Sequence, residues 1–346
     1  MKQTKVVQIG KVKIGGGNTI LIQSMCNTDT RDALTTTKQI LDLEKAGCEI
    51  IRVAVPDMAA AKAIKEIKKN INIPLVADIH FDYNLALESI KNGVDKVRIN
   101  PGNIGKMENV QKVVDACIDK NIPIRIGINT GSLEKEAEIK YGRTAQAMVE
   151  SALKHIQILE KLHFYNIVIS MKASDIQRTV DAYRLLSKKV DYPLHLGITE
   201  AGTVNTGTIK SAVGLGIMLN EGLGDTIRVS LTGDPLEEVF VGWEILKSLK
   251  LRSRGVNLIS CPTCGRTEIN LIGLANKVEK ALIGVDKPIT VAVMGCVVNG
   301  PGEAKEADIG IAGGHHTGVI FKKGKILKTV PENKLFFELL REIKKI

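Results

Sequence analysis

Hydrophobic residues fall into two alternating kinds of segment along most of the chain. Eight short runs rich in Val, Ile and Leu are typical of buried strands: residues 20–24, 49–55, 74–79, 96–100, 123–129, 166–171, 194–199 and 226–231. Between them lie longer stretches with apolar residues every three or four positions, as in amphipathic helices, for example 35–46, 107–119, 145–162 and 235–249. Eight alternating strand and helix units over roughly 230 residues predict an α/β fold, the TIM (β/α)8 barrel.

The two ends of the chain follow other patterns. Residues 6–14 predict a small hairpin that precedes the barrel. Residues 251–255 are basic and turn-like, so we expect a barrel domain at 1–255 and a second domain at 256–346. The second domain should contain a helix at 268–282, strands at 290–294, 309–312 and 319–321, and a helix from residue 332. These elements predict a small α+β domain.

Composition narrows the class of protein. The 346 residues carry a net charge of +10, which suits an anionic partner or a lysine-rich surface. Aromatic residues make up 3% of the chain, too few for stacking on single-stranded nucleic acid. No segment approaches the roughly 20 apolar residues that a membrane helix needs, and the cysteine pattern is not that of a disulfide framework. We therefore expect a cytoplasmic protein that binds neither membranes nor nucleic acid.

Polar residues cluster at the predicted carboxyl ends of the barrel strands, where TIM barrels place their active sites. They are Arg52, Asp78, His80, Arg98, Asn100, Arg125, Asn129, Ser170, Lys172, Glu200, Arg228 and Ser230. Each could serve in a buried structural ion pair. Together, however, four arginines and a lysine would leave buried positive charge uncompensated unless an anion joins them. The pattern predicts a phosphorylated substrate, with Glu200 able to transfer a proton.

A metal site is indicated in the second domain. Cys261 and Cys264 form a Cys-x-x-Cys, and Cys296 follows about 30 residues later, a spacing that suits a metal or an iron-sulfur cluster. A zinc site would need a fourth ligand, for which His315 and His316 are candidates. An iron-sulfur cluster accepts three cysteines, and a reversal at residues 299–302 would turn Glu303 back toward it. Spacing alone leaves both metals open.

Several motifs resemble those of one enzyme family. CPTCGRTE and GCVVNGPGEA in the second domain, with RVAVPD, KVRINPGN, IRIGINTGSL, SMKASD, GITEAG and IRVSLTGDP in the barrel, are similar to the 4-hydroxy-3-methylbut-2-enyl diphosphate synthase family. The resemblance covers essentially the whole chain and is to the compact, two-domain bacterial form.

The resemblance implies a function and a site. It implies a [4Fe-4S] cluster held by Cys261, Cys264, Cys296 and the carboxylate of Glu303, with electrons from flavodoxin or ferredoxin. The substrate would be 2-C-methyl-D-erythritol 2,4-cyclodiphosphate, reduced and dehydrated in isoprenoid synthesis by a homodimer. Glu303 and Glu200 would be catalytic. The residues implied to bind substrate are Arg52, Arg98, Asn100, Arg125, Asn129 and Lys172.

Two alternatives come from other classes. A zinc-stapled, nucleic-acid-binding barrel protein would account for the positive charge and the Cys-x-x-Cys. A cofactor-free aldolase or lyase acting on a phosphorylated sugar would use Lys172 as a Schiff base. The colour of the anaerobically purified protein separates the first from an iron-sulfur enzyme, and borohydride trapping on Lys172 tests the second.

Overall fold

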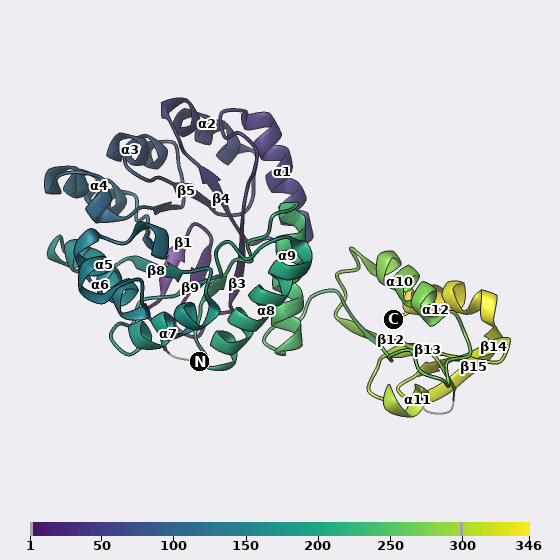
Figure 1. The fold of residues 1–346 in the computed structure, drawn as a ribbon. Helices are drawn as coiled ribbons and strands as arrows, with labels where there is room; N and C mark the ends of the chain where they lie inside the picture. Colours follow the sequence, from purple (N-terminus) through teal and green to yellow (C-terminus); the bar gives the residue numbers. More distant parts are fainter. Residues whose placement is uncertain (1–2, 298–299) are drawn as a thin grey trace. The chain divides into compact units, whose positions relative to one another are not determined.

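The chain divides into two compact units. The computed structural model describes residues 3–297 and 300–346. Met1–Arg252 forms one unit, here called the barrel unit, and Ser253–Ile346 forms the other, the sheet unit (Figure 1). The domain boundary predicted at residue 255 lies close to this division.

The barrel unit is built around eight parallel strands. Their order around the barrel is β8-β7-β6-β5-β4-β3-β10-β9, and a parallel bridge from Ile169 to Leu194 joins β8 to the chain that enters β9. The strands are β3 (Leu21–Met25), β4 (Ile50–Ala54), β5 (Leu75–Asp78), β6 (Lys96–Arg98), β7 (Ile124–Asn129), β8 (Ile167–Lys172), β9 (His195–Leu196) and β10 (Thr226–Ile227). All eight predicted strands are present, and the predicted TIM barrel is confirmed.

Helices surround these strands in Figure 1. They are α1 (Ala33–Ala46), α2 (Met58–Lys69), α3 (Tyr83–Lys91), α4 (Met107–Asp119), α5 (Lys135–Tyr141), α6 (Ala145–Lys161), α7 (Ile176–Ser187), α8 (Val204–Asn220) and α9 (Pro235–Ser248), with short 3-10 turns η1 (Pro101–Asn103) and η2 (Thr130–Ser132). An aspartate side chain caps the first turn of five of them, at Asp32, Asp57, Asp82, Asp175 and Asp234. These caps fix where each loop from a strand ends and its helix begins.

A hairpin closes the amino-terminal end of the barrel. Its strands are β1 (Val7–Ile9) and β2 (Val12–Ile14), paired antiparallel as the sequence predicts. Its buried apolar side chains form a cluster with residues from the strands of the barrel: Val7, Ile9, Ile14, Leu21, Ile50, Val76 and Val168. The barrel therefore opens at the carboxyl ends of its strands.

The sheet unit is a five-stranded mixed sheet with helices. The strand order is β11-β12-β13-β14-β15, parallel from β11 to β13 and antiparallel beyond. The elements are β11 (Val256–Ser260), α10 (Leu271–Leu282), β12 (Ile289–Met294), α11 (Gly300–Glu303), β13 (Ile309–Gly314), β14 (Thr317–Lys322), β15 (Lys325–Pro331), η3 (Glu332–Lys334) and α12 (Leu335–Ile343). The predicted α+β class is confirmed. The reversal predicted at residues 299–302 includes Asn299, outside the described residues, while Gly300–Glu303 is a helical turn.

Candidate functional site

Basic side chains converge at the carboxyl end of the barrel. Arg52 lies in β4, Arg98 ends β6, Arg125 lies in β7, Lys172 ends β8 and Arg228 follows β10. Arg98, Arg125 and Lys172 are buried. Pairing in the parallel sheet sets Asp78 beside Arg98, and Arg98 beside Arg125. The structure thus brings together the bases that the sequence predicts at this mouth.

Asp78 is the acid at the centre of this group. Its carboxylate lies 3.1 Å from Nη1 of Arg98 and 3.6 Å from Nε of Arg52. Burial raises the pKa of the Asp78 carboxyl, but Arg52, Arg98 and Arg125 outweigh burial and lower the pKa to about 2. Nε2 of His80 lies 3.8 Å from the same carboxylate. Asp78 is therefore ionised and shared between two arginines.

Glu238 of α9 supplies the second carboxylate. It is buried and lies 3.5 Å from Nε of Arg228. It also accepts hydrogen bonds from the Ser24 hydroxyl and from the backbone amide of Leu231. These contacts fix Glu238 in one orientation, so that Arg228 is held at the end of β10.

Three buried bases remain without such a partner. Among the residues that the structure describes, Lys96, Arg125 and Lys172 have no ion pair within 4.0 Å. Arg125 is 1% exposed, and its Nε and Nη1 atoms have no hydrogen-bond partner. Burial lowers the pKa of Arg125, and the neighbouring Arg52 and Arg98 lower it further. This uncompensated positive charge is what an anion would balance, as the sequence predicts.

Lys172 lies in a chain of polar side chains. Its Nζ is 3.4 Å from Nε2 of His195, whose Nδ1 is 2.8 Å from the hydroxyl of Thr226. A Cβ atom at Gly197 would lie 2.5 Å from Nζ of Lys172, so only glycine leaves room for the lysine there. Burial lowers the pKa of Lys172, and Arg228 and Arg125 lower it further. Burial and the neighbouring arginines therefore weaken the hold of the Lys172 amine on its proton.

The three remaining residues expected in the barrel have different surroundings. Asn100 is buried, and its amide bonds both the N–H and the carbonyl of Gly127 at 2.9 Å, so it fastens the end of β6 to β7. Asn129 ends β7 and begins the η2 turn. Glu200 is exposed in the loop after β9 with φ of 52°, a left-handed conformation that is rare for this residue type. Strained backbone of this kind is concentrated at functional sites.

The predicted cluster ligands follow neighbouring strands of the sheet unit. β11 and β12 are parallel with Ser260 opposite Val293, so Cys261 and Cys296 both lie just beyond the carboxyl ends of adjacent strands. The Sγ of Cys261 accepts a hydrogen bond of 3.1 Å from the amide of Gly295. Ala304, next to Glu303, belongs to an apolar cluster against which Cys261 packs. The backbone thus brings the three segments together.

Thiol and carboxylate chemistry at this place suits an iron-sulfur centre. No group of three or more His, Cys, Asp or Glu side chains in the described part of the chain converges closely enough to hold a metal ion. The guanidinium of Arg266, however, interacts with Cys264, Cys296 and Glu303, which raise its pKa. Hydrogen bonds from Arg266 and Thr267 lower the pKa of the Cys264 thiol, favouring the thiolate that ligates metals. The types of donor present therefore suit an iron-sulfur cluster.

The sequence of each unit matches a known protein domain. Residues 4–243 match the GcpE TIM-barrel domain, and residues 257–345 match the GcpE protein C-terminal domain. The chain belongs to the GcpE family. Its whole length is 65% identical to the 4-hydroxy-3-methylbut-2-en-1-yl diphosphate synthase (flavodoxin) of Caldanaerobacter subterraneus subsp. tengcongensis, covering 98% of that protein. Over 345 residues it is 60% identical to the enzyme of the same name from Geobacter sulfurreducens, covering 99% of this chain and 98% of that one.

Solved structures resemble the barrel of this GcpE chain in fold. The dihydropteroate synthases of Stenotrophomonas maltophilia and Yersinia pestis superimpose with TM-scores of 0.52 and 0.51, at 11% and 10% identity. Each superposition covers 71% of this chain and 98% of the dihydropteroate synthase chain. At such low identity the likeness supports the TIM barrel and nothing more. The family match supports the predicted resemblance, and the nucleic-acid-binding alternative has no support.

Sequence reasoning missed several buried polar residues of the GcpE barrel. Lys96 is fully buried, and its Nζ donates to Oε1 of Gln23 at 3.3 Å. A signal for Lys96 was available, because it lies two residues before Arg98 and so shares its face of the strand. Glu238 lies on a helix whose pattern shows only amphipathicity, and His195 lies within an apolar strand, so neither gave a comparable signal.

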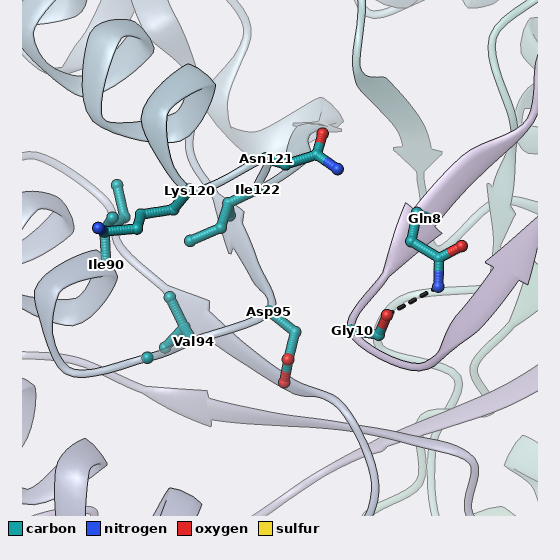
Figure 2. Close-up of a pocket in the computed structure, with 9 residues that line it drawn as sticks. Gln8, Gly10, Ile90, Val94, Asp95, Lys120, Asn121 and Ile122 are labelled. Carbon is teal, nitrogen blue, oxygen red and sulfur yellow. Dashed lines mark hydrogen bonds between the residues drawn. The ribbon is translucent and has the colours of Figure 1, made fainter.

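A separate pocket lies at the other end of the barrel. It has a volume of about 310 Å³ and lies between the β1–β2 turn and the loops that lead into β6 and β7 (Figure 2). Asp95 beside it accepts hydrogen bonds from the amide of Leu75 and from Nζ of Lys68, and a Cβ at Gly10 would meet its carboxylate. These contacts are structural.

Among the described helices, none is long and apolar enough to cross a membrane.

Proposed function

We propose that this GcpE chain is an oxidoreductase that converts 2-C-methyl-D-erythritol 2,4-cyclodiphosphate into 4-hydroxy-3-methylbut-2-enyl diphosphate. The reaction opens the cyclic diphosphate and removes one hydroxyl group as water, with two electrons from reduced flavodoxin. The observation that carries the proposal is the surplus of buried positive charge at the barrel mouth, which a diphosphate would balance. The names of the relatives supply the reaction and its electron donor.

The arginines would bind the diphosphate. Arg98 and Arg52 are held by Asp78, so their guanidinium groups are oriented before a ligand arrives. Arg125 is enclosed beneath them and would act through its positive charge, because its unpaired N–H donors do not reach the surface of the site. A phosphate placed against these groups restores the balance of charge that the protein lacks by itself.

Lys172 and Glu200 would manage protons. Lys172, with its lowered pKa and its contact with His195, can donate a proton to an oxygen that leaves as water. Glu200 lies exposed after β9, where a carboxylate can exchange protons between solvent and the mouth. Both roles follow from position and charge, and both stay predictions until tested.

The iron-sulfur cluster would be held by Cys261, Cys264, Cys296 and Glu303. It would supply electrons one at a time together with a Lewis-acidic iron for the oxygen that departs. Cys261 and Cys296 begin neighbouring loops, while the carboxylate of Glu303 is a weaker ligand for iron than a fourth thiolate and so is easier to exchange. The homodimer implied by the family resemblance also stays a prediction, which mass photometry of the purified chain can test.

Turnover by the purified chain tests the proposal. The protein, purified without oxygen and reconstituted with iron and sulfide, should be brown and should release the linear diphosphate from the cyclic one when reduced flavodoxin is added. Mass spectrometry follows the product. A colourless protein with one zinc per chain and no turnover would contradict the proposal, and turnover that survives loss of the cluster with borohydride-trapped substrate on Lys172 would favour a Schiff-base enzyme.

A further inference from the structure

One buried histidine joins the two loops that follow β6 and β7. His155 of α6 is 2% exposed. Its Nδ1 accepts a hydrogen bond of 3.1 Å from the amide of Gly102, in the loop after β6. Its Nε2 lies 2.6 Å from Oε1 of Glu134, in the loop after β7. Gly102, His155 and Glu134 are called the His155 bridge below.

The contacts define where the protons lie. Because an amide N–H faces Nδ1, that nitrogen carries no proton, and the proton of a neutral imidazole is on Nε2, toward Glu134. Burial raises the pKa of the Glu134 carboxyl, but the close contact with His155 outweighs burial and lowers the pKa to about 2. Glu134 is therefore a carboxylate, and the bridge runs from an amide donor through the imidazole to a negative charge.

The two loops are alike in how they begin. Each opens with a short 3-10 turn, η1 after Asn100 and η2 after Asn129, and neither turn has a side-chain cap. Glu134 directs its carboxylate to His155 and makes no side-chain cap on α5, a helix with no buried residue. A Cβ atom at Gly102 would lie 2.9 Å from Cε1 of His155, so the loop approaches the ring as closely as only glycine allows. The imidazole thus links two segments that also pack on the barrel core, the first through Pro101 and Ile104 and the second through Leu133.

We propose that His155 is a positioning residue that fixes both loops at the barrel mouth, and with them the ends of β6 and β7 that meet the anionic substrate. The inference rests on the proposed function for the identity of that substrate. His155 acts through the loops and does not touch the reacting atoms. Losing the bridge should lower the fraction of protein whose loops are ordered for binding, which weakens apparent affinity in proportion.

Two variants remove the bridge and one preserves it. His155→Phe keeps a flat ring but removes both nitrogens, and Glu134→Ala removes the carboxylate alone. Glu134→Gln keeps an acceptor for the Nε2 proton and should behave like the wild type. Tyr192→Phe is the matched control, because the Tyr192 hydroxyl donates to Glu160, also on α6, at 2.8 Å, and Tyr192 lies just before β9, at the other end of the barrel.

Binding and loop order are measured separately on the full-length, reconstituted protein. Calorimetric titration with the cyclic diphosphate, without reductant, should give a Kd about five- to thirtyfold higher in His155→Phe and Glu134→Ala, as expected for loss of one buried hydrogen bond. Under turnover, KM should rise by a similar factor while kcat changes less than about threefold. Hydrogen exchange should become faster at residues 101–105 and 130–134 in both variants, and remain as in the wild type in Tyr192→Phe.

The outcomes separate this inference from the proposed function. Unchanged Kd and unchanged exchange in Glu134→Ala would overturn the inference, and that variant decides the matter if His155→Phe does not fold. An equal rise in Kd in Tyr192→Phe would also overturn it, since the effect would then be general destabilisation. A wild type that fails to turn over the cyclic diphosphate rejects the proposed function alone, because loop exchange and titration with inorganic pyrophosphate still test the bridge.

Discussion

Replacing Arg125 by methionine should stabilise the protein while weakening its affinity for anions. Arg125 is fully enclosed, and each of its unpaired donors costs about 1–3 kcal/mol. Replacing a buried ion pair by apolar residues of similar volume is typically neutral or favourable by about 1–4 kcal/mol, and Arg125 has no ion-pair partner among the described residues that its loss would leave unpaired. We therefore expect the free energy of unfolding to rise by up to about 4 kcal/mol, whereas most buried substitutions lower it. Loss of this positive charge beneath the bound anion should raise the Kd for inorganic pyrophosphate roughly tenfold or more, because one of the charges that balance the anion is removed.

Urea unfolding in phosphate-free buffer measures the first effect. Trp243 is the single tryptophan of the sequence and is buried in α9, so its fluorescence reports the unfolding of the barrel unit alone. Ile126→Val, one position along the same strand, is the control, with an expected loss of about 0.5–1.5 kcal/mol. If Arg125→Met lowers the free energy of unfolding by more than about 1 kcal/mol, the charge is compensated within the protein and the reasoning is wrong.

Three further predictions concern other parts of the site. Since the pKa of Asp78 is about 2 in the folded protein and about 3.9 when unfolded, its stabilisation of about 2–3 kcal/mol is present above pH 4 and is lost as pH falls toward 2. Asp78→Asn should therefore flatten the acid limb of a stability-against-pH curve. Gly127→Ala places a Cβ against the side chain of Arg98 and should raise the Kd for the cyclic diphosphate about tenfold or more by calorimetry; an unchanged Kd would show that Arg98 does not contact the ligand. Cys296→Ser should lose the visible absorption of the cluster, whereas Glu303→Ala should keep part of it and lose most turnover; full turnover in Glu303→Ala would refute the role of that carboxylate.

The barrel was predictable because its strands are buried on both faces. Such strands give continuous apolar runs, and each of the eight predicted runs contains or overlaps an observed strand. β11 and β15 of the sheet unit were not predicted. Both are edge strands, with β15 mostly exposed and lysine-rich, so neither has the apolar run or alternation of a buried strand. Edge strands depend on pairing with a neighbour, which local sequence does not reveal.

Which residues lie at the site was predictable, but which of them contact one another was less so. Strand ends pointed to Arg52, Arg98 and Lys172, because parallel strands present their carboxyl ends on one face. That Asn100 is bound to the backbone of Gly127 could not be foreseen, since a polar residue at a strand end gives the same pattern whether it faces a ligand or a neighbouring chain segment. Pairing across the barrel, such as that of Glu238 with Arg228, depends on closure of the fold.

The hairpin beneath the barrel has a consequence for the supply of protons. β1 and β2 pack across the amino-terminal ends of the strands, so apolar side chains separate the buried bases from solvent at that end of the barrel. An anion bound at the carboxyl ends of the strands would block solvent from the other side. While it is bound, Lys172 and His195 would not exchange protons with solvent, so their protonation would stay as it was when the anion bound. The rate at which bound protein exchanges those protons with deuterated water should therefore match the rate at which the ligand departs.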